Sequence, residues 1–308
     1  MCTAVSYYNC FGRNLDLEHG YNERVIITPK NYKFKMRCTE DFTPSFAMIG
    51  MAAEAKDYPL YFDCMNEKGL CMAGLNFPNN AVYHPFDSGK INVTPFELIP
   101  YILGKCQSVL EAEKLLFNIN LVNENFSNEL PLSPLHWIIS DSKQSITVES
   151  VRQGLRFYKN TVGVLTNNPP FLKQLEGLKK YEQLFEPQIP KNNGSEDYSL
   201  GLDGVGIPGD FSSHSRFVKA AFVKYRSPKN LSGSQAVNQL FHVLSSVAMP
   251  KGCVLTPKGE CEYTRYTSCC DCKNGDYYFT TYDSGKKIKA SLSDYDLCGD
   301  KIYLCAGV

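Results

Sequence analysis

The chain has 308 residues, 43% of them hydrophobic, and its 32 Lys and Arg residues balance 32 Asp and Glu residues, so the formal net charge is zero. This balance argues against a dedicated nucleic-acid or anionic-membrane binder, which carries a basic excess. The composition is unusual in its thirteen cysteines. The N-terminus lacks the basic and apolar segments of an export signal, and no later stretch is apolar enough for a membrane span. We therefore expect reduced thiols in a cytoplasmic globular protein.

Alternating apolar and polar residues joined by short turns predict three groups of strands. The first group is 3–9, 24–28, 46–53 and a hairpin of 61–65 and 70–77 with Gly69 in its turn. The second is a meander of four strands at 135–140, 145–151, 155–160 and 162–166. The third is 264–270, 276–283 and 287–293, with Asn274-Gly275 as a strong hairpin signal.

Helices are expected between these groups of strands. Ser108 and Glu111 form a capping box that opens a helix to about residue 119. The other predicted helices are 95–104, 171–185, 213–225 and 233–247. With no linker long enough to separate domains, we predict one α+β domain over residues 1–308, with two largely antiparallel sheets and helices outside. The segment 187–212 is long, polar and glycine-rich, which is typical of a functional or mobile loop.

Two motifs in the chain match known sites only in form. Residues 204–209 satisfy G-x-G-x-x-G, but no buried strand precedes them, so a turn-rich loop is the better interpretation. Residues 269–272 contain C-x-x-C, but the neighbouring cysteines do not form a second zinc knuckle. Packing thiols are favoured over metal ligands. A non-catalytic, zinc-stabilised binding protein remains the alternative from another functional class.

Cys2 is the cysteine whose position suggests chemistry. A small side chain at position two permits removal of the initiator methionine, which would leave a thiol and a free α-amine on one residue. Because the reference pKa of an α-amine is about 7.7–8.0, a useful fraction is neutral and accepts the thiol proton. The thiol is then the nucleophile and the amine its base. A second-position cysteine also occurs often by chance, so the argument depends on its neighbours.

Arg13 and Asp16 follow on the next predicted strand. An arginine near a thiol stabilises the thiolate, and a carboxylate holds an α-amine by a charge-assisted hydrogen bond. Because the two residues are three apart, a regular strand faces them to opposite sides. We therefore expect the strand to bend or end between them if both reach Cys2.

Two apolar strands each run into an asparagine followed by proline. Proline stops a strand ladder, which leaves Asn76 and Asn167 at strand ends. Amide or backbone N–H groups placed there would stabilise the oxyanion of an acyl-transfer intermediate. The alternative is that each asparagine is an ordinary turn residue before proline.

These residues belong to a longer pattern that resembles the choloylglycine hydrolase family over nearly the whole chain. Nine blocks follow the order of that family: MCT at 1–3, FGRNLD at 11–16, ITPKNY at 27–32, MNEKGL at 65–70, AGLNFP at 73–78, LHWIISD at 135–141, GVLTNNP at 163–169, GIPGDFSSHSRF at 206–217 and TRYTSC at 264–269. The segment between Cys2 and Phe11 is a few residues shorter than in many members, so the first hairpin must be tight.

The resemblance implies an N-terminal-nucleophile hydrolase with a four-layer αββα sandwich. It implies a bacterial, cytoplasmic homotetramer that uses no cofactor or metal and cleaves the amide between a bile acid and glycine or taurine. Matching motifs make Cys2 the nucleophile after loss of Met1. They also assign the remaining catalytic roles, with Arg13 and Asp16 beside the nucleophile, Asn76 and Asn167 stabilising the oxyanion, and Arg216 completing the site.

Substrate choice is the open point within the family. Penicillin V acylases use the same nucleophile but tend to carry an aromatic residue at the position of Asn76, so asparagine favours bile salts. A steroid needs an apolar groove, for which Leu15, Leu135 and the stretch 51–62 are candidates. The alternative is that these residues belong to the core. The stretch 118–134 resembles the excursion that members use in tetramer contacts.

Overall fold

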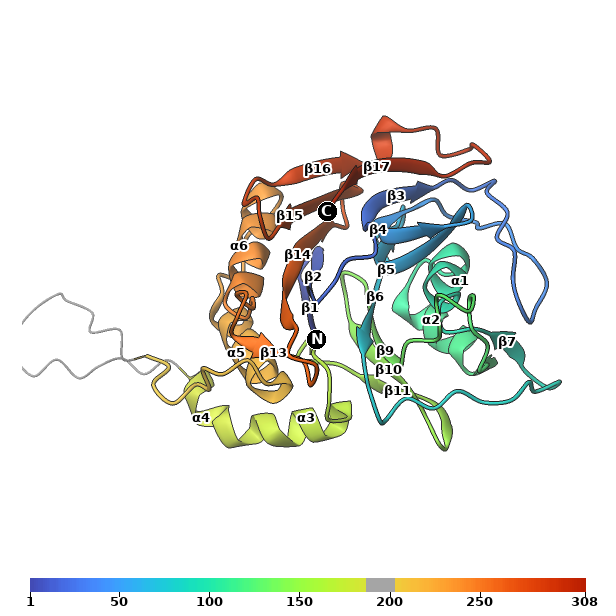
Figure 1. Ribbon diagram of the computed structural model, residues 1–308. Helices are drawn as coiled ribbons and strands as arrows, with labels where there is room; N and C mark the ends of the chain where they lie inside the picture. Colours follow the sequence, from blue (N-terminus) through green and yellow to red (C-terminus); the bar gives the residue numbers. More distant parts are fainter. Residues whose placement is uncertain (187–202) are drawn as a thin grey trace, which may run out of the picture.

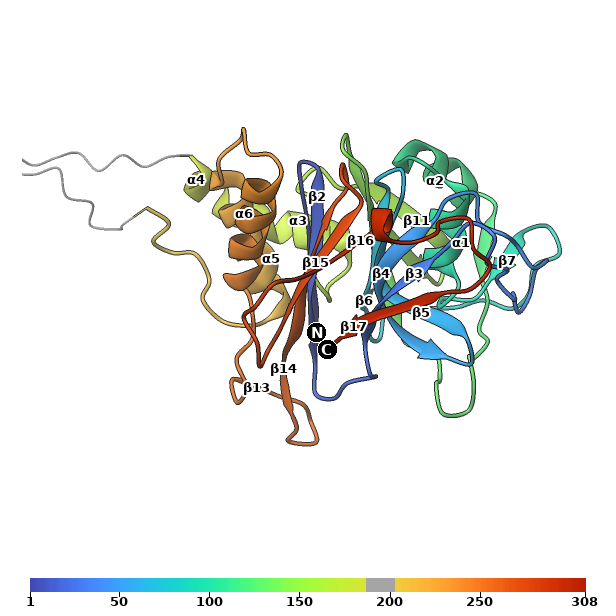
Figure 2. The same ribbon diagram turned by 90° about the horizontal axis from the view of Figure 1, so that it is seen from above.

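The computed structural model describes residues 1–186 and 203–308. In this part of the chain two β-sheets lie face to face, and helices cover the outer side of each sheet (Figure 1 and Figure 2). One sheet has seven strands, in the order β12 (Val164–Leu165), β1 (Cys2–Tyr7), β2 (Cys10–Leu17), β14 (Cys261–Asp271), β15 (Asp276–Thr281) and β16 (Ile288–Ser291), with β13 (Val254–Leu255) paired to β14. Both termini lie near the space between the sheets (Figure 2).

The second sheet has eight strands among the described residues. Their order is β11 (Gly154–Lys159), β10 (Ser145–Val151), β9 (Leu135–Ser140), β6 (Cys71–Asn76), β5 (Tyr58–Asn66), β4 (Met48–Ala55), β3 (Arg24–Thr28) and β17 (Tyr303–Gly307). A small parallel pair, β7 (Ile91–Val93) and β8 (Ile119–Leu121), lies apart from it. Every other pairing between the strands that the structure describes is antiparallel, and the sequence predicts largely antiparallel sheets.

The helices form the two outer layers of the sandwich. The eight-stranded sheet packs against α1 (Leu98–Lys105), and α2 (Val109–Leu116) lies on the same side of this sheet as α1. The seven-stranded sheet packs against α5 (Ser213–Arg226) and α6 (Ser234–Ser245), with α3 (Phe171–Leu178) and α4 (Glu182–Phe185) beside α5. Two 3-10 turns, at Lys179–Tyr181 and Leu292–Asp294, complete the elements of the described residues. None of the helices in 1–186 and 203–308 is both long and apolar enough to cross a membrane.

Strand β9 shows how the sheets acquire two buried faces. Trp137 and Ile139 belong to the core against α1 and α2, whereas Ile138 belongs to the core between the sheets. Because both faces of the strand are buried, its sequence is a continuous apolar run rather than an alternating one. The same arrangement places His136 in the interior, where its ring stacks on Phe77 with centroids 4.2 Å apart.

The predicted turns between paired strands are confirmed where glycine marks them. Gly69 has φ +80° in the β5–β6 turn, and Gly275 has φ +71° in the β14–β15 turn. Both values lie in the left-handed region that glycine adopts without steric cost. In addition, a Cβ on Gly69 would lie 2.7 Å from the backbone oxygen of Cys272. The close approach of the two sheets therefore also requires glycine there.

The predicted four-stranded meander at 135–166 is wrong in its last member. Strand β12 does not follow β11 in the eight-stranded sheet but pairs with β1 in the other sheet. The cause is the turn at Asn160–Gly163, where the Asn160 side chain accepts a hydrogen bond from Gly163 N and donates one to Val164 O. Ser6 N then donates to Gly163 O and starts the new pairing. The chain thus crosses between sheets where the sequence suggests a hairpin.

The helices agree with expectation except at one end. Ser108 Oγ accepts a hydrogen bond from Glu111 N at 3.3 Å and caps α2, as the capping box predicts. The predicted helix 171–185 is divided, because α3 ends at Leu178 and a 3-10 turn precedes α4. Of the predicted loop 187–212, residues 187–202 lie outside the described residues. Residues 204–209 form turns and irregular structure, consistent with a loop rather than a dinucleotide site.

All thirteen cysteines are free thiols in the structure. Cys269 and Cys270 of the C-x-x-C motif are buried on β14, and Cys272 Sγ lies 3.2 Å from Cys71 Sγ of the facing sheet. Within residues 1–186 and 203–308, no group of three or more His, Cys, Asp or Glu side chains is arranged to hold a metal ion. Cys71, Cys269 and Cys270 belong to the hydrophobic core between the sheets, and Cys272 packs against it.

Candidate active site

Cys2 is the first residue of β1 and is 3% exposed, at the end of a strand in the middle of the sandwich. The β1–β2 hairpin has a two-residue loop, in which Tyr8 has φ +51°. The expectation of a tight first hairpin is confirmed. Its register pairs Cys2 with Leu15 and Ala4 with Arg13, which brings the motif at 11–16 beside the thiol.

Arg13 projects from β2 into the space between the sheets. Its Nη1 donates to Phe62 O at 2.9 Å and to Gly74 O at 2.8 Å, both in the eight-stranded sheet. Its Nη2 is buried and has no hydrogen-bond partner among the described residues. Burial lowers the pKa of Arg13, but the neighbouring Cys2 and other acidic groups more than offset this and raise it. A permanent positive charge with free N–H groups therefore lies near the thiol.

Asp16 approaches the N-terminus from the opposite face of β2. Its Oδ1 accepts a hydrogen bond from Thr264 Oγ1 at 2.6 Å, and its Oδ2 lies 3.8 Å from Arg216 Nη1 of α5. The sequence predicts that β2 bends or ends between Arg13 and Asp16, and the strand does not end there. Strand β2 runs unbroken through both residues, and the bulge lies on β14 at Arg265. The side chains of Arg13 and Asp16 flank Cys2 because Cys2 is at the end of β1, where groups from both faces of the sheet can approach it.

Asn167 connects three elements beside Cys2. Its Oδ1 accepts hydrogen bonds from Cys2 N and from Arg216 Nη2, each at 2.8 Å. Its Nδ2 donates to Asn76 O at 2.7 Å, and its backbone N donates to Ser213 Oγ at 2.8 Å. Asn167 thereby fixes the end of β12 against the end of β6 and the start of α5. One Nδ2 hydrogen remains for a ligand, since the amide group carries two.

Arg216 is buried on α5 and contacts the first two residues of β1. Its Nη1 donates to Cys2 O and to Thr3 Oγ1, each at 2.6 Å. Burial lowers the pKa of Arg216, while Asp16 and Cys2 act in the opposite direction. Together with Asn167, this guanidinium fixes the first peptide unit of β1.

Asn76 and Leu135 form a cross-strand pair at the ends of β6 and β9. Both are partly exposed, and none of the described residues forms a hydrogen bond with the Asn76 side chain. This amide is therefore available to a ligand. Leu15, the other predicted substrate contact, is 3% exposed and belongs to the core between the sheets. The predicted catalytic residues thus lie around Cys2, and Leu135 is more accessible than Leu15. In the other candidate for the groove, 51–62, the side chains of Tyr58 and Tyr61 are buried in the core against α1 and α2, as the alternative of core residues expects.

Met1 is present ahead of Cys2, so the Cys2 nitrogen here is a peptide amide. The Met1 amine donates to Asp16 O at 2.6 Å and forms an ion pair with Glu262. Burial lowers the pKa of this amine from its usual value of 8.0, although Cys2 and Asp16 raise it. An amine at this place is thus easier to deprotonate than a solvated one.

The sequence reasoning missed one buried acidic residue of this region. Asp63 on β5 is 1% exposed and accepts hydrogen bonds from Tyr266 and Tyr277 of the opposite sheet. A signal was available, because a lone carboxylate in the apolar run YFDCM must find buried partners.

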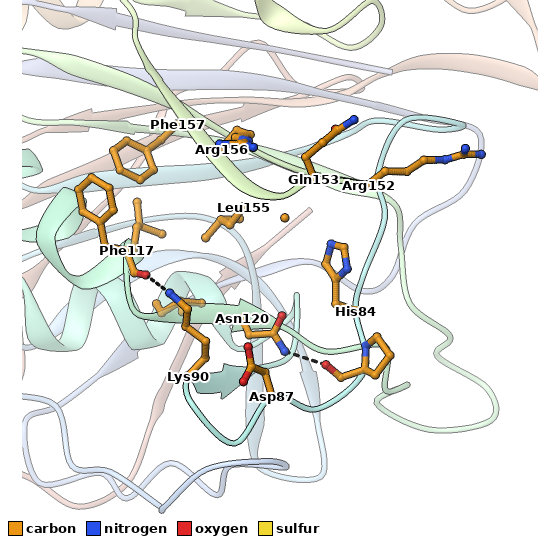
Figure 3. Close-up of a pocket in the computed structure, with 14 residues that line it drawn as sticks. His84, Asp87, Lys90, Phe117, Asn120, Arg152, Gln153, Leu155, Arg156 and Phe157 are labelled. Carbon is orange, nitrogen blue, oxygen red and sulfur yellow. Dashed lines mark hydrogen bonds between the residues drawn. The ribbon is translucent and has the colours of Figure 1, made fainter.

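A separate hollow of about 750 Å³ lies elsewhere on the molecule. It is bounded by β11 and by the β7–β8 region, and Figure 3 shows Lys90 directed at the carbonyl of the adjacent Phe117. None of the predicted catalytic or substrate-binding residues lines this hollow. The convergence of polar groups on Cys2, rather than the size of a cavity, identifies the candidate active site.

Comparison with known proteins adds independent support. The profile of the family "Linear amide C-N hydrolases, choloylglycine hydrolase family" matches residues 2–306. The chain is 50% identical to the bile salt hydrolase/transferase of Lactiplantibacillus plantarum, with 95% of this chain and 93% of the relative covered. It is 35% identical to the bile salt hydrolase/transferase of Clostridium perfringens, with 98% and 95% covered.

The solved structures agree with the observed fold. A variant of the conjugated bile acid hydrolase from Clostridium perfringens superposes with a TM-score of 0.89 at 33% identity, covering 99% of this chain and 97% of the other. The penicillin V acylase from Agrobacterium tumefaciens shares the fold, with a TM-score of 0.79 at 20% identity and coverage of 98% and 90%. The predicted N-terminal-nucleophile sandwich is confirmed. The chain belongs to the choloylglycine hydrolase family of linear amide C–N hydrolases.

Proposed function

We propose that this chain hydrolyses the amide bond of glycine- or taurine-conjugated bile salts, with Cys2 as nucleophile after removal of Met1. One observation carries the proposal: Asn167 Oδ1 binds the Cys2 nitrogen while Arg216 binds the same oxygen. An N-terminal amine needs such an acceptor to keep its lone pair directed at its own thiol. The relatives named as bile salt hydrolases supply the substrate class.

The first half of the reaction forms a thioester. The neutral Cys2 amine takes the thiol proton, and the thiolate attacks the amide carbonyl carbon. The carbonyl oxygen becomes an oxyanion, which the side chains of Asn76 and Asn167 stabilise through their free N–H groups. The intermediate then collapses, the C–N bond breaks, and the Cys2 ammonium gives its proton to the departing nitrogen of glycine or taurine. The bile-acyl group remains on Sγ.

The second half returns the free enzyme. The Cys2 amine takes a proton from water, and the hydroxide attacks the thioester carbonyl. Collapse of this intermediate breaks the C–S bond, releases the bile acid and restores the thiol. Arg13 stabilises the thiolate through its charge, and Asp16 Oδ2 accepts a hydrogen bond from the amine when that group is protonated. The sequence of steps uses only groups of the chain and water.

Two alternatives to bile salt hydrolysis are distinguished by a direct assay. The chain is only 20% identical to the penicillin V acylase, so that comparison supports the shared fold and not the substrate. Membership of a hydrolase family disfavours the zinc-stabilised binding protein. Purified protein should hydrolyse glycocholate and taurocholate faster than penicillin V under identical conditions, and Cys2→Ala should hydrolyse none of them. A preference for penicillin V, or release of no product from any conjugate, would overturn the proposal.

The resemblance to the family also supports a proposal about the state of the protein. In this view the mature chain is a single catalytic domain that works as a cytoplasmic bacterial homotetramer, with 118–134 in subunit contacts. Light scattering after size exclusion tests the assembly, with four times the chain mass of 34.6 kDa as the expected result.

A further inference from the structure

Asp63 joins the two sheets next to the candidate active site. Its carboxylate is 1% exposed and accepts three hydrogen bonds. Tyr266 donates to Oδ2 at 2.6 Å, Tyr277 donates to Oδ1 at 2.6 Å, and Ser268 donates to Oδ1 at 3.1 Å. All three donors lie on β14 and β15 of the facing sheet. We call these four residues the Asp63 cluster.

Strand β5 has a bulge directly before Asp63. In its pairing with β4, Asp63 lies opposite Met51, but Tyr61 lies opposite Ala52, so Phe62 has no partner residue. A bulge of this kind turns the extra residue out of the ladder and is common beside active sites. The carbonyl of Phe62 is thereby released from strand pairing and accepts the hydrogen bond from Arg13.

The other acceptor of Arg13 has a similar origin. Strands β5 and β6 pair as far as Asp63 and Ala73 and then separate, so the next residue, Gly74, pairs only with β9. Arg13 Nη1 enters this opening and donates to both Phe62 O and Gly74 O. The Arg13 guanidinium, from the seven-stranded sheet, therefore bridges the opening between β5 and β6 of the other sheet. The Asp63 cluster fixes Asp63, the last residue of β5 that pairs with β6 before this opening.

The cluster also surrounds Arg13 on its own sheet. Ser268 is the cross-strand neighbour of Arg13 on β14. Arg13 Nη1 is occupied by its two bonds to Phe62 O and Gly74 O, whereas Arg13 Nη2 is buried and has no hydrogen-bond partner among the described residues. Of the neighbouring charges, that of Cys2 has the largest effect on the pKa of Arg13. A shift of the Phe62 carbonyl would rotate the guanidinium and move Nη2 relative to the thiol.

We propose that Asp63 is a positioning residue that acts through Arg13, because its three hydroxyl donors fix the bulge whose carbonyl directs the guanidinium toward Cys2. The inference rests on the proposed function, in which Arg13 stabilises the Cys2 thiolate. It assigns the tyrosines of β14 and β15 a part in the reactivity of a thiol on β1.

Tyr277→Phe is the most direct test, since it removes one hydroxyl and leaves the charges and the ring packing unchanged. Tyr61→Phe is the matched control. Tyr61 lies on β5, the strand that carries Asp63, and is also buried, in the core against α1 and α2. Its variant loses a hydrogen bond of 2.7 Å to Thr28. Both variants should lose similar thermal stability. The rate of Cys2 alkylation by iodoacetamide, followed by peptide mapping in protein lacking Met1, reports on the thiolate.

Tyr277→Phe should slow Cys2 alkylation and lower kcat/KM by about fivefold, which corresponds to the loss of one ordinary hydrogen bond. Tyr61→Phe should change neither. In an Arg13→Leu background, Tyr277→Phe should have no further effect on alkylation, because the residue through which it acts is gone. Should Arg13→Leu not fold, Arg13→Lys serves as the background, since lysine lacks the guanidinium that the bulge directs.

Two results would overturn the inference: equal alkylation rates in Tyr277→Phe and Tyr61→Phe, or an unchanged effect of Tyr277→Phe without the Arg13 guanidinium. Either result would show that the Asp63 cluster stabilises the fold without positioning Arg13. Failure of the wild-type protein to hydrolyse conjugated bile salts would contradict the proposed function instead, and the alkylation comparison would still decide the role of Asp63.

Discussion

Asp16 Oδ2 lies 3.8 Å from Arg216 Nη1, and both side chains are buried. The same Oδ2 atom has no hydrogen-bond partner among the described residues, whereas Oδ1 is bound by Thr264. A buried carboxylate oxygen without a donor is costly unless a charge lies nearby. We infer that this oxygen accepts a hydrogen bond from the Cys2 ammonium once Met1 is removed.

Retention of a residue before Cys2 should abolish hydrolysis. In the chain with Met1, the Cys2 nitrogen is an amide that donates to Asn167 Oδ1, and an amide cannot accept the thiol proton. Loss of a general base costs about a hundredfold or more. A cleavable N-terminal extension tests this, because a protease that leaves Cys2 first should restore activity. Full activity of the uncut protein would refute the role of the amine.

Asp16→Asn should move the pH profile of kcat/KM toward lower pH. Burial lowers the pKa of the Met1 amine, and Asp16 raises it. We expect Asp16 to act in the same direction on the Cys2 amine that loss of Met1 exposes, so removing the carboxylate charge should lower the pKa of that amine. Because the neutral amine is the active form, activity is lost as pH falls through this pKa, and the variant should keep its plateau to lower pH. Its plateau rate should be about tenfold lower through loss of orientation.

The control for this pH shift is Asp141→Asn, a change of the same type at a carboxylate that accepts a hydrogen bond from Val109 N at the start of α2. Asp141→Asn should have the same pH profile of kcat/KM as the wild-type protein. Superimposable profiles for Asp16→Asn and wild type would show that Asp16 does not act on the amine.

Asn167→Ala should lower kcat by about a hundredfold or more, which is typical of removing one oxyanion donor. The substitution also removes the acceptor shared by Cys2 N and Arg216 Nη2. The adjacent Asn168 is the matched control, since its amide binds Pro78 O and Asn80 rather than the site. Steady-state kinetics of Asn168→Ala should stay near wild type. Equal losses in both variants would indicate a structural effect of the loop alone.

Lys224→Met should flatten the dependence of stability on alkaline pH. Burial lowers the pKa of Lys224 to about 8, from an ordinary value of 10.5. Between these values the unfolded chain binds more protons than the folded one, so the free energy of unfolding contributed by Lys224 rises with pH across this window. Below it the lysine is charged in both states and its contribution is constant.

Urea denaturation of Lys224→Met and wild type at several pH values across this window measures the effect. The stability of the variant relative to wild type should fall steadily as the wild-type lysine becomes neutral. A constant difference between the two proteins over the window would show that Lys224 titrates normally in the folded state.

The sequence was sufficient to locate the chemistry because the catalytic groups sit in short motifs at strand ends. Cys2, Asn76 and Asn167 could each be found from position or from the proline that follows. The arrangement of Arg13 and Asp16 around Cys2 could not be predicted from the sequence. It depends on the position of Cys2 at the end of β1, where side chains from both faces of β2 can reach it. Local spacing alone suggested a broken strand, and the structure supplied a strand end instead.

Features that depend on contacts between the sheets were beyond local pattern. The turn at Asn160 sends β12 to the other sheet through side-chain hydrogen bonds that no alternation of residues reveals. The bulge at Phe62 arises from register between β4 and β5, while Asp63 finds its partners on strands some two hundred residues away, with a separation of 203 residues to Tyr266. Such partners are set by tertiary structure.

The proposed mechanism carries a bile-acyl group on the sulfur of Cys2. Protein mixed with taurocholate and quenched in acid during turnover should carry a mass increase equal to the cholyl group, and peptide mapping should place it on the peptide that begins with Cys2. Cys2→Ala should carry no such mass and should release no taurine. Steady hydrolysis by Cys2→Ala, or an adduct that maps to another of the thirteen cysteines, would contradict the account.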